Sequence, residues 1–360
     1  MKSSLLLLAG LLSAAAPYRL ALPGYPFEFP RDHFNHPDFQ TEWWYYTGNL
    51  RAADGHRFGF ELTFFRRALV RNPADFSPWK LDDVYVAHLA LSDITGQRFY
   101  HASRLNRPGP GFAGAALRDA LVWNGNWSAR WTLPPPAGFS TVQSLRAFDA
   151  DFSFNLGIES RKPPVIHGKR GVSQKAPGKG HASHYISFTR LDTNGVIEVG
   201  GKSYAVRGAA WMDHEFFTHQ LDRGQAGWDW FSLQFDDNTE LMLFRLRRKD
   251  GAIDPFSAGT FVDARGAARH LDQGDFSLEP GRTWKSEKTG AVYPLAWKIA
   301  VPSLSLRLDV TTPLDQQELT PQGGYTPVYW EGAVDVGGSR RGSGYLEMTG
   351  YAGSQGLTGL

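Results

Sequence analysis

Short stretches in which apolar and polar residues alternate recur along the chain, with turn residues between them. Alternation in 57–65 places the large apolar side chains on one face of an extended strand, namely Phe58, Phe60, Leu62 and Phe64. The turn 52–55 separates this stretch from the aromatic run 42–47, so the two stretches predict a hairpin. Further strands of the first half are expected at 84–91, 127–133, 145–158, 184–191 and 195–206.

The second half of the chain has the same character. No long stretch carries a helical period, and strands are expected at 228–235, 241–247, 259–263, 293–299, 303–311, 329–336 and 342–351. The 39 glycines and 22 prolines also favour turns and strands over helices. A chain of 360 residues exceeds the size at which one hydrophobic core usually stops growing. We therefore predict an all-β protein with two domains of barrel or sandwich type.

The N-terminus has the features of a secretory signal. A charged start at Lys2 is followed by the apolar run 5–12 and by the small residues 14–16. This run is too short to span a bilayer, and no later segment approaches membrane-spanning length. We predict that residues 1–16 are a signal peptide and that the mature chain has no integral membrane segment. The expected location is the periplasm or the outside of the cell.

The charge distribution and the cysteine content bear on partners and stability. The 38 basic and 36 acidic residues are spread along the chain and give a net charge of +2, so no nucleic-acid partner is expected. A hydrophobic small molecule or lipid-like ligand fits better, and a cell-envelope partner is left open. The basic segment 162–179 is expected to be a long loop that either is a solvated cover or gates a barrel mouth, and its charge can attract an acidic ligand head-group. A chain without cysteine is held by core packing alone.

Several motifs of known chemistry fail on inspection. His214 and His219 belong to a sequence that resembles a zinc-protease helix, but the second histidine comes one residue too late. Gly109, Gly111 and Gly114 have the spacing of a dinucleotide-binding loop, yet prolines flank them and no strand–helix junction is evident. We therefore predict neither a metal nor a cofactor.

Four sequence blocks carry a resemblance to a known family. They are HPDFQTEWWYYTGNL at 36–50, the pair 164–168 and 183–187, WMDHEF at 211–216, and the pair 329–332 and 344–351. In this order they resemble the carotenoid 1,2-hydratase/AttH family. The resemblance implies two tandem lipocalin-like antiparallel β-barrels, which we place at 27–216 and 217–358. The family includes hydratases of carotenoid double bonds and relatives that catalyse ring closures, so the resemblance alone leaves the reaction open.

The chemistry of hydration indicates which residues to examine. Adding water to an electron-rich C=C needs an acid that protonates carbon, a pocket that stabilises the cation and a base that activates water. Buried carboxyls and aromatic faces can supply these functions. If 210–216 is extended, Asp213 and Glu215 share one face with Trp211, and His214 lies on the other face. We predict Asp213 and Glu215 as the acid and base, with His214 in a supporting position.

Two further predicted strands contain an acidic residue among aromatic residues. Alternation places Glu42, Trp44 and Tyr46 together, and it places Asp229 opposite the neighbouring tryptophans 228 and 230. Asp229 is therefore a third candidate acid or base, whereas Glu331 and Glu347 are interpreted as structural. The residues predicted to bind substrate are Glu42, Trp44, Tyr46, Tyr185, Trp211, His214, Trp228 and Trp230.

Two functions fit these residues. The first is an exported, cofactor-independent, hydratase-like lyase that acts on a hydrophobic unsaturated substrate such as a carotenoid, terpenoid or lipid-like molecule. The alternative is a periplasmic lipocalin-like protein that binds lipids or other hydrophobic ligands without catalysis. Aromatic residues in barrel strands mostly serve packing, and buried carboxyls are often satisfied by an arginine or a backbone amide. The sequence therefore leaves both functions open.

Overall fold

The computed structural model describes residues 18–69, 77, 79–134, 141–320 and 327–353, and the predicted signal peptide at 1–16 lies outside them. Most of the regular structure in the described residues is antiparallel β-sheet. The helical segments here are short 3-10 turns, namely η1 (Arg31–His33), η2 (Gln273–Asp275) and η3 (Pro302–Leu304). In this part of the chain no helix is both long and apolar enough to cross a membrane.

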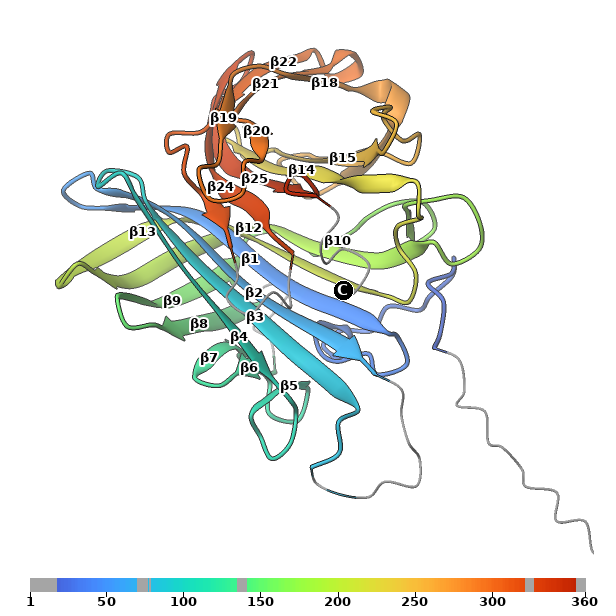
Figure 1. Cartoon of the computed structure of the whole chain (residues 1–360), viewed down its shortest axis with the longest axis vertical. Coiled ribbons are helices and arrows are strands. Elements are labelled where there is room, and N and C mark those ends of the chain that lie inside the picture. The colour runs from blue at the N-terminus through green and yellow to red at the C-terminus, as the bar shows by residue number, and fades with distance from the viewer. Residues whose placement is uncertain (1–17, 70–76, 78, 135–140, 321–326, 354–360) are drawn as a thin grey trace, which may run out of the picture.

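The first sheet has thirteen strands and curls into a nearly closed barrel, which occupies the lower part of Figure 1. Its order is β4-β3-β2-β1-β13-β12-β9-β8-β7-β6-β5, and β10 and β11 pair with β12. The strands are β1 (Thr41–Ala52), β2 (Arg57–Ala68), β3 (Asp83–Asp93), β4 (Arg98–Asn106), β5 (Ala113–Ala116), β6 (Leu121–Asn124), β7 (Trp127–Trp131), β8 (Val142–Phe148), β9 (Phe152–Ser160), β10 (Val165–Ile166), β11 (Ser173–Gln174), β12 (Ala182–Val199) and β13 (Lys202–Phe217).

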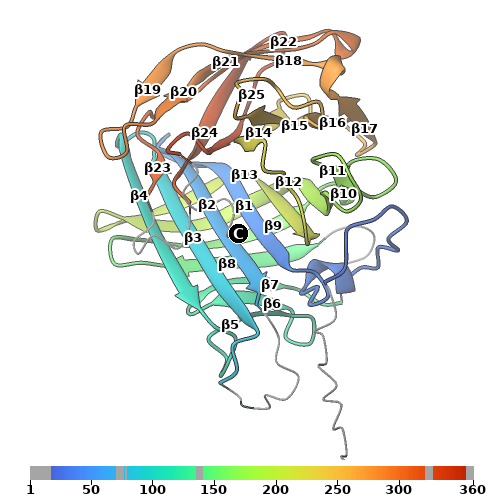
Figure 2. The ribbon, with the colours of Figure 1, turned by 45° about the vertical axis from the view of Figure 1, so that its right-hand side comes forward.

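The second sheet has ten strands and forms a half-barrel above the first (Figures 1 and 2). Its order is β17-β16-β15-β14-β25-β24-β22-β21-β18, with β23 paired to β24, and β19 and β20 form a separate ribbon. The strands are β14 (Gln225–Phe235), β15 (Glu240–Arg248), β16 (Ala258–Val262), β17 (Ala268–Asp272), β18 (Ser277–Pro280), β19 (Thr283–Lys285), β20 (Val292–Pro294), β21 (Ala296–Val301), β22 (Leu306–Thr311), β23 (Glu318–Leu319), β24 (Tyr329–Gly338) and β25 (Gly342–Thr349). The predicted all-β fold of two lipocalin-like domains is confirmed.

Strand β1 and residues 210–217 of β13 are largely buried on both faces, because one face lines the first barrel and the other meets the second sheet. Trp44 and Tyr46 of β1 belong to the core of the first barrel. Tyr45, between them, packs with Trp211 of β13 and Trp230 of β14 in a separate apolar cluster between the sheets. Because successive side chains of a strand point to opposite faces, β1 contributes residues to two different hydrophobic cores.

The two sheets approach each other closely where β2 meets β24. At Gly59 of β2, a Cβ atom would lie 2.9 Å from the Ala333 side chain of β24, closer than non-bonded carbon atoms normally come. Any larger residue at position 59 would push the sheets apart. The absence of a side chain at this point lets the second sheet rest directly on the outside of the first barrel.

The basic segment 162–179 runs along the junction of the two domains. Lys162 Nζ lies 2.7 Å from the Glu240 carboxylate of β15. His167 Nδ1 lies 2.8 Å from the Thr260 hydroxyl of β16. These buried contacts fix the segment against the second sheet, so it is part of the wall between the domains and not a solvated cover.

Candidate functional site

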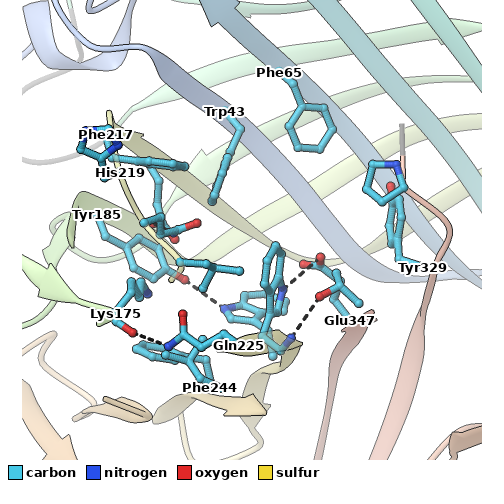
Figure 3. Close-up of a pocket in the computed structure, with 18 of the residues that line it drawn as sticks. Trp43, Phe65, Lys175, Tyr185, Phe217, His219, Gln225, Phe244, Tyr329 and Glu347 are labelled. Atoms are coloured by element: carbon cyan, nitrogen blue, oxygen red, sulfur yellow. Dashed lines mark hydrogen bonds between the residues drawn. The ribbon is translucent and has the colours of Figure 1, made fainter. Parts of the chain in front are cut away.

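A pocket of about 470 Å³ lies where the two sheets meet. One wall comes from β1, β2, β12 and β13 of the first sheet, and the other from β14, β15, β24 and β25 of the second. Figure 3 shows Lys175 and Tyr185 on one side of it and Tyr329 and Glu347 on the other. This volume lies in the range that holds small organic ligands in proteins.

Asp213 is held in a fixed orientation by three hydrogen-bond donors. The Trp211 indole N–H donates to Oδ1 over 2.6 Å, and the Ser187 hydroxyl donates to the same oxygen. The Tyr185 hydroxyl donates to Oδ2 over 2.5 Å, and the Trp230 indole N–H donates to the Tyr185 oxygen over 3.0 Å. The carboxyl group is therefore joined to both domains through one chain of hydrogen bonds.

Burial raises the pKa of Asp213 to about 7, although its three donors oppose the rise, and the charge of Glu215 adds to it. Burial also raises the pKa of Glu215, which is opposed by the positive charge of Lys175. Among the described residues, no arginine or lysine nitrogen lies within 4.0 Å of either carboxyl group. This pair can therefore hold and release a proton close to neutral pH, as acid–base catalysis requires.

Lys175 brings a positive charge into the same pocket. Its side chain is only 4 % exposed, and its Nζ atom lies 3.6 Å from the centre of the Phe244 ring and 5.2 Å from that of Tyr185. The Gln225 amide of β14 donates to the Lys175 backbone oxygen over 2.7 Å and fixes the main chain. Burial lowers the pKa of this lysine, and the charges of Glu215 and Asp213 oppose the change.

The apolar surface of the pocket is mostly aromatic. Trp228 and Trp230 of β14 line it, as predicted, together with Trp43, Tyr45 and Phe244, which the sequence analysis missed. The Trp228 indole N–H donates to Glu347 over 3.2 Å. Such faces can pack on an apolar ligand and can stabilise positive charge.

Three glutamates, the partly exposed Glu347 and the buried Glu61 and Glu331, extend from the pocket into the contact between the domains. Burial raises the pKa of Glu347, which lines the pocket, to about 8 and that of Glu61 to about 7. The pKa of Glu331 is raised further, by burial and by both of these charges, and it accepts a hydrogen bond from the Tyr45 hydroxyl. Within the described part of the chain, one oxygen each of Glu61 and Glu331 has no hydrogen-bond partner. Glu347 therefore belongs to the site, although the sequence indicated only a structural role.

Four residues predicted to bind substrate lie on the opposite face of β1 and β13, inside the first barrel. The Glu42 carboxylate lies 2.8 Å from His214 Nε2 and 3.1 Å from Arg66 Nε. Trp44 stacks on His214 at a ring-centre distance of 4.9 Å, and the Tyr46 hydroxyl donates to Gln143 over 2.8 Å. None of these four is among the described residues that line the pocket. The reason is the strand period, since their neighbours Trp43, Tyr45, Asp213 and Glu215 face the pocket.

Glu42, with His36 and His214, also forms the one group of potential metal ligands found in the described residues. The ligand atoms lie within 4.8 Å of one another. They are, however, already used, because His36 Nδ1 lies 2.6 Å and His214 Nε2 lies 2.8 Å from the same carboxylate oxygen. The Arg66 guanidinium bonds the other oxygen and would repel a cation. The donor set fits an internal hydrogen-bond network better than a metal centre.

Asp229 and Trp211 take positions that differ from the prediction. Asp229 points into the second barrel, where its carboxylate lies 2.7 Å from Arg245 and accepts a hydrogen bond from Tyr351 over 2.9 Å. The negative charge of this carboxylate is compensated by the arginine, and Asp229 does not line the pocket. Trp211 is buried beside the pocket and contacts Asp213 instead of the cavity. Tyr185, predicted to bind substrate, lines the pocket.

Comparison with known proteins agrees with this architecture. The AttH-like family matches residues 20–351. A solved structure from Nitrosomonas europaea assigned to AttH is 34 % identical, covers 92 % of this chain and 99 % of its own length, and superposes with a TM-score of 0.82. Kievitone hydratase from Nectria haematococca is 14 % identical over 94 % of this chain and 98 % of its own, with a TM-score of 0.67, and shares the fold.

A curated relative adds a sequence link. The dehydratase asqC of Emericella nidulans is 23 % identical over 210 residues, which are 56 % of this chain and 58 % of that protein. The chain thus spans little more than half of this relative's length. The match of the family across nearly all described residues, together with the Nitrosomonas structure, shows that the chain belongs to the AttH-like family.

Proposed function

We propose that this protein is a cofactor-independent, hydratase-like carbon–oxygen lyase that adds water to, or removes it from, a hydrophobic unsaturated substrate. The observation that carries the proposal is the pair Asp213 and Glu215, buried in an aromatic pocket with no arginine or lysine nitrogen within 4.0 Å among the described residues. Burying uncompensated carboxyls costs stability. Acids placed at such a cost in a cavity are candidates for catalysis.

The two carboxyls can divide the work of hydration. The charge of Lys175 favours the ionised form of Glu215, and the resulting negative charge helps Asp213 to keep its proton. The pair then offers one acid and one base on the same strand, both facing the cavity. Asp213 is oriented by Tyr185, Ser187 and Trp211, so its proton is presented in a fixed direction.

The names of two similar proteins support a reaction of this class. One is a dehydratase and one a hydratase, and water removal and water addition are the two directions of one reaction type. The aromatic walls favour a largely apolar substrate. A carotenoid, terpenoid or lipid-like molecule satisfies this requirement.

A second candidate function is ligand binding without catalysis. The apolar part of the pocket lining is mostly aromatic, as expected of a lipocalin-like carrier. In such a carrier the buried acids would bind polar groups of the ligand. The two functions differ in one measurable respect, which is turnover of a bound compound.

Mass spectrometry of an organic extract from the protein purified out of its native source would identify the bound compound. That compound, incubated with the protein in water enriched in oxygen-18, should gain or exchange one hydroxyl oxygen. Asp213→Asn should bind the compound but exchange it at least 100-fold more slowly. Asp192→Asn, at an exposed position of β12, is the matched control and should behave as wild type. Exchange no faster than without protein in all three proteins would leave binding as the function, whereas equal, faster exchange in all three would show catalysis that does not depend on Asp213.

Export is part of the proposal and rests on residues 1–16 alone. Their charged start, apolar run and small residues match a secretory signal. N-terminal sequencing of the protein from its native cells should find a mature chain that starts near residue 17. An intact N-terminus in a cytoplasmic fraction would contradict export without affecting the proposed reaction.

A further inference from the structure

The position of Lys175 restricts the chemistry that the pocket can support. Its ammonium group is buried against the Phe244 ring, and no carboxylate of the described residues lies within 4.0 Å of it. In its protonated form it is a cation that faces the cavity without a direct counter-ion among the described residues. Asp213 and Glu215 act on it only at longer range.

A fixed positive charge has opposite effects on the two routes to hydration. Protonating an isolated C=C creates a carbocation, and an ammonium group in the same small cavity would destabilise that cation. Removing a proton beside a carbonyl creates an enolate, whose negative oxygen the same ammonium group would stabilise. The pocket thus favours chemistry in which negative charge develops on a substrate oxygen.

Resting on the function proposed above, we propose that Lys175 binds the carbonyl oxygen of the substrate. The substrate class is then an apolar α,β-unsaturated carbonyl compound, or the β-hydroxy carbonyl compound that yields it by loss of water. This assignment narrows the hydrophobic unsaturated substrate to one whose reacting double bond is conjugated to a carbonyl group.

The reaction balances without any other reactant. In the direction of dehydration, the Glu215 carboxylate takes the proton from the carbon next to the carbonyl. The C–H electron pair forms a double bond to the carbonyl carbon, and the C=O π pair moves onto the oxygen. The enolate then forms the C=C and breaks the C–O bond at the next carbon. The departing hydroxyl takes the Asp213 proton and leaves as water. Transfer of the proton from Glu215 to Asp213 restores the site, and hydration is the reverse sequence.

Several contacts fix Lys175 so that its ammonium group faces the part of the cavity where the substrate carbonyl oxygen would bind. The Gln225 amide of β14 fixes its backbone oxygen, and its backbone N–H donates to the His181 oxygen over 2.9 Å. Tyr185, which lies 5.2 Å from Nζ by its ring centre, also donates to Asp213. Lys175 and the acid pair therefore surround one cavity, and a substrate between them can meet both.

The test uses β-ionone, a conjugated ketone, and β-ionol, which has the same skeleton with an alcohol in place of the carbonyl. Both are titrated into Asp213→Asn protein, in which turnover is blocked, by quenching of tryptophan fluorescence. The absorption band of β-ionone is recorded in parallel, because hydrogen bonding of an enone oxygen to an ammonium group shifts that band to longer wavelength.

Adding Lys175→Met should abolish the band shift and weaken β-ionone binding by about 10- to 100-fold, while β-ionol binding changes less than about threefold. If the methionine variant fails to fold, Lys175→Gln replaces it. Because glutamine keeps a neutral hydrogen-bond donor, its loss of β-ionone affinity should be smaller than that expected for methionine. Lys169→Met is the matched control, since this exposed lysine of the same segment pairs with Asp272 outside the pocket, and it should bind both compounds as the parent does.

Two outcomes would overturn the assignment: no band shift with β-ionone, or an equal loss of β-ionone and β-ionol binding in Lys175→Met. The latter is expected if Lys175 is only a distant counter-ion of the acids. The proposed function is judged separately, by oxygen-18 exchange in the wild-type protein. A band shift without oxygen-18 exchange of any β-hydroxy ketone would refute the proposed hydratase activity and retain carbonyl binding by Lys175. Exchange without a band shift would retain the hydratase activity and refute carbonyl binding by Lys175.

Discussion

The two faces of strands β1 and β13 hold their acids in opposite ways. On the face inside the first barrel, Glu42 is bound by Arg66 and by two histidines, and these partners hold its pKa well below its usual range. On the face toward the second sheet, burial raises the pKa of Asp213 and Glu215. Burial is nearly complete on both faces, so the difference comes from the partners.

The comparison separates a structural acid from a candidate catalytic one. The carboxylate of Glu42 is compensated by these partners, so it joins β1 to β2, to β13 and to His36 in the segment after η1. Asp213 has hydrogen-bond donors but no arginine or lysine within 4.0 Å among the described residues, and it opens onto a cavity. An acid that is buried, oriented and left without a counter-ion can exchange its proton with a ligand.

The largest effect on stability is expected on the inner face. Glu42→Gln removes one of the two carboxylates that pair with the buried Arg66 guanidinium, the other being Asp83 at 2.9 Å, and it also removes the anion that binds His36 and His214. This should lower the free energy of unfolding by about 3–5 kcal/mol. Urea denaturation measures the change. A stable Glu42→Gln protein that binds ligand poorly would instead assign Glu42 to the pocket.

On the outer face the corresponding change should affect the reaction and spare the fold. Glu215→Gln removes the base, so turnover of the native substrate should fall by about 100-fold or more. Its unfolding free energy should stay within about 1 kcal/mol of wild type or rise, because a poorly compensated buried charge is removed. The comparison of the two faces fails if Glu215→Gln unfolds as readily as Glu42→Gln.

The raised pKa of Asp213 predicts a pH dependence of both rate and stability. The protonated acid is lost as the pH rises through about 7, so turnover at pH 8 should be about tenfold below its value at pH 6. The folded state holds this proton more tightly than the unfolded chain, whose pKa is near 4. The stability from the protonated form is therefore full below pH 4 and is lost as the pH rises through 7.

Asp213→Asn isolates this contribution from those of Glu61 and Glu347, which also titrate in this range. Its unfolding free energy should fall less between pH 5 and pH 8 than that of wild type. Identical pH profiles in the two proteins would mean that Asp213 stays ionised throughout this range.

The smallest expected effect comes from the second sheet. Trp228→Phe keeps an aromatic face in the pocket but loses the hydrogen bond to Glu347. Ligand affinity should fall by about three- to tenfold, which corresponds to one ordinary hydrogen bond. Trp123→Phe, at a tryptophan of β6 that is absent from the pocket lining, is the control for fluorescence titrations.

The sequence predicted the fold and one strand of the site well, because both depend on local alternation. Alternation placed Asp213 and Glu215 on one face and His214 on the other, as the structure does. Alternation could not tell which face of β1 meets the pocket, because both faces are buried and Glu42 and Tyr45 lie in equally aromatic surroundings. That choice is made by the second sheet, whose packing depends on residues far away in the chain.

Lys175 and Glu347 show the same limit. Lys175 is one of several basic residues in its segment, and only its contact with Phe244 of β15 distinguishes it. Glu347 becomes part of the site through pairing of β14 with β25, which sets it opposite Trp230. Asp229 was selected because it neighbours two tryptophans, but its partners Arg245 and Tyr351 are not adjacent in sequence.

The division of the pocket between two sheets has a consequence for how such proteins diversify. Asp213, Glu215 and Tyr185 all precede residue 218, whereas the tryptophans and phenylalanine of the facing wall follow it. Substitutions in the second half of the chain can therefore reshape the facing wall while Asp213, Glu215 and Tyr185 stay untouched. Under the proposed function, the space offered to a substrate can thus change without any change in the two candidate acids.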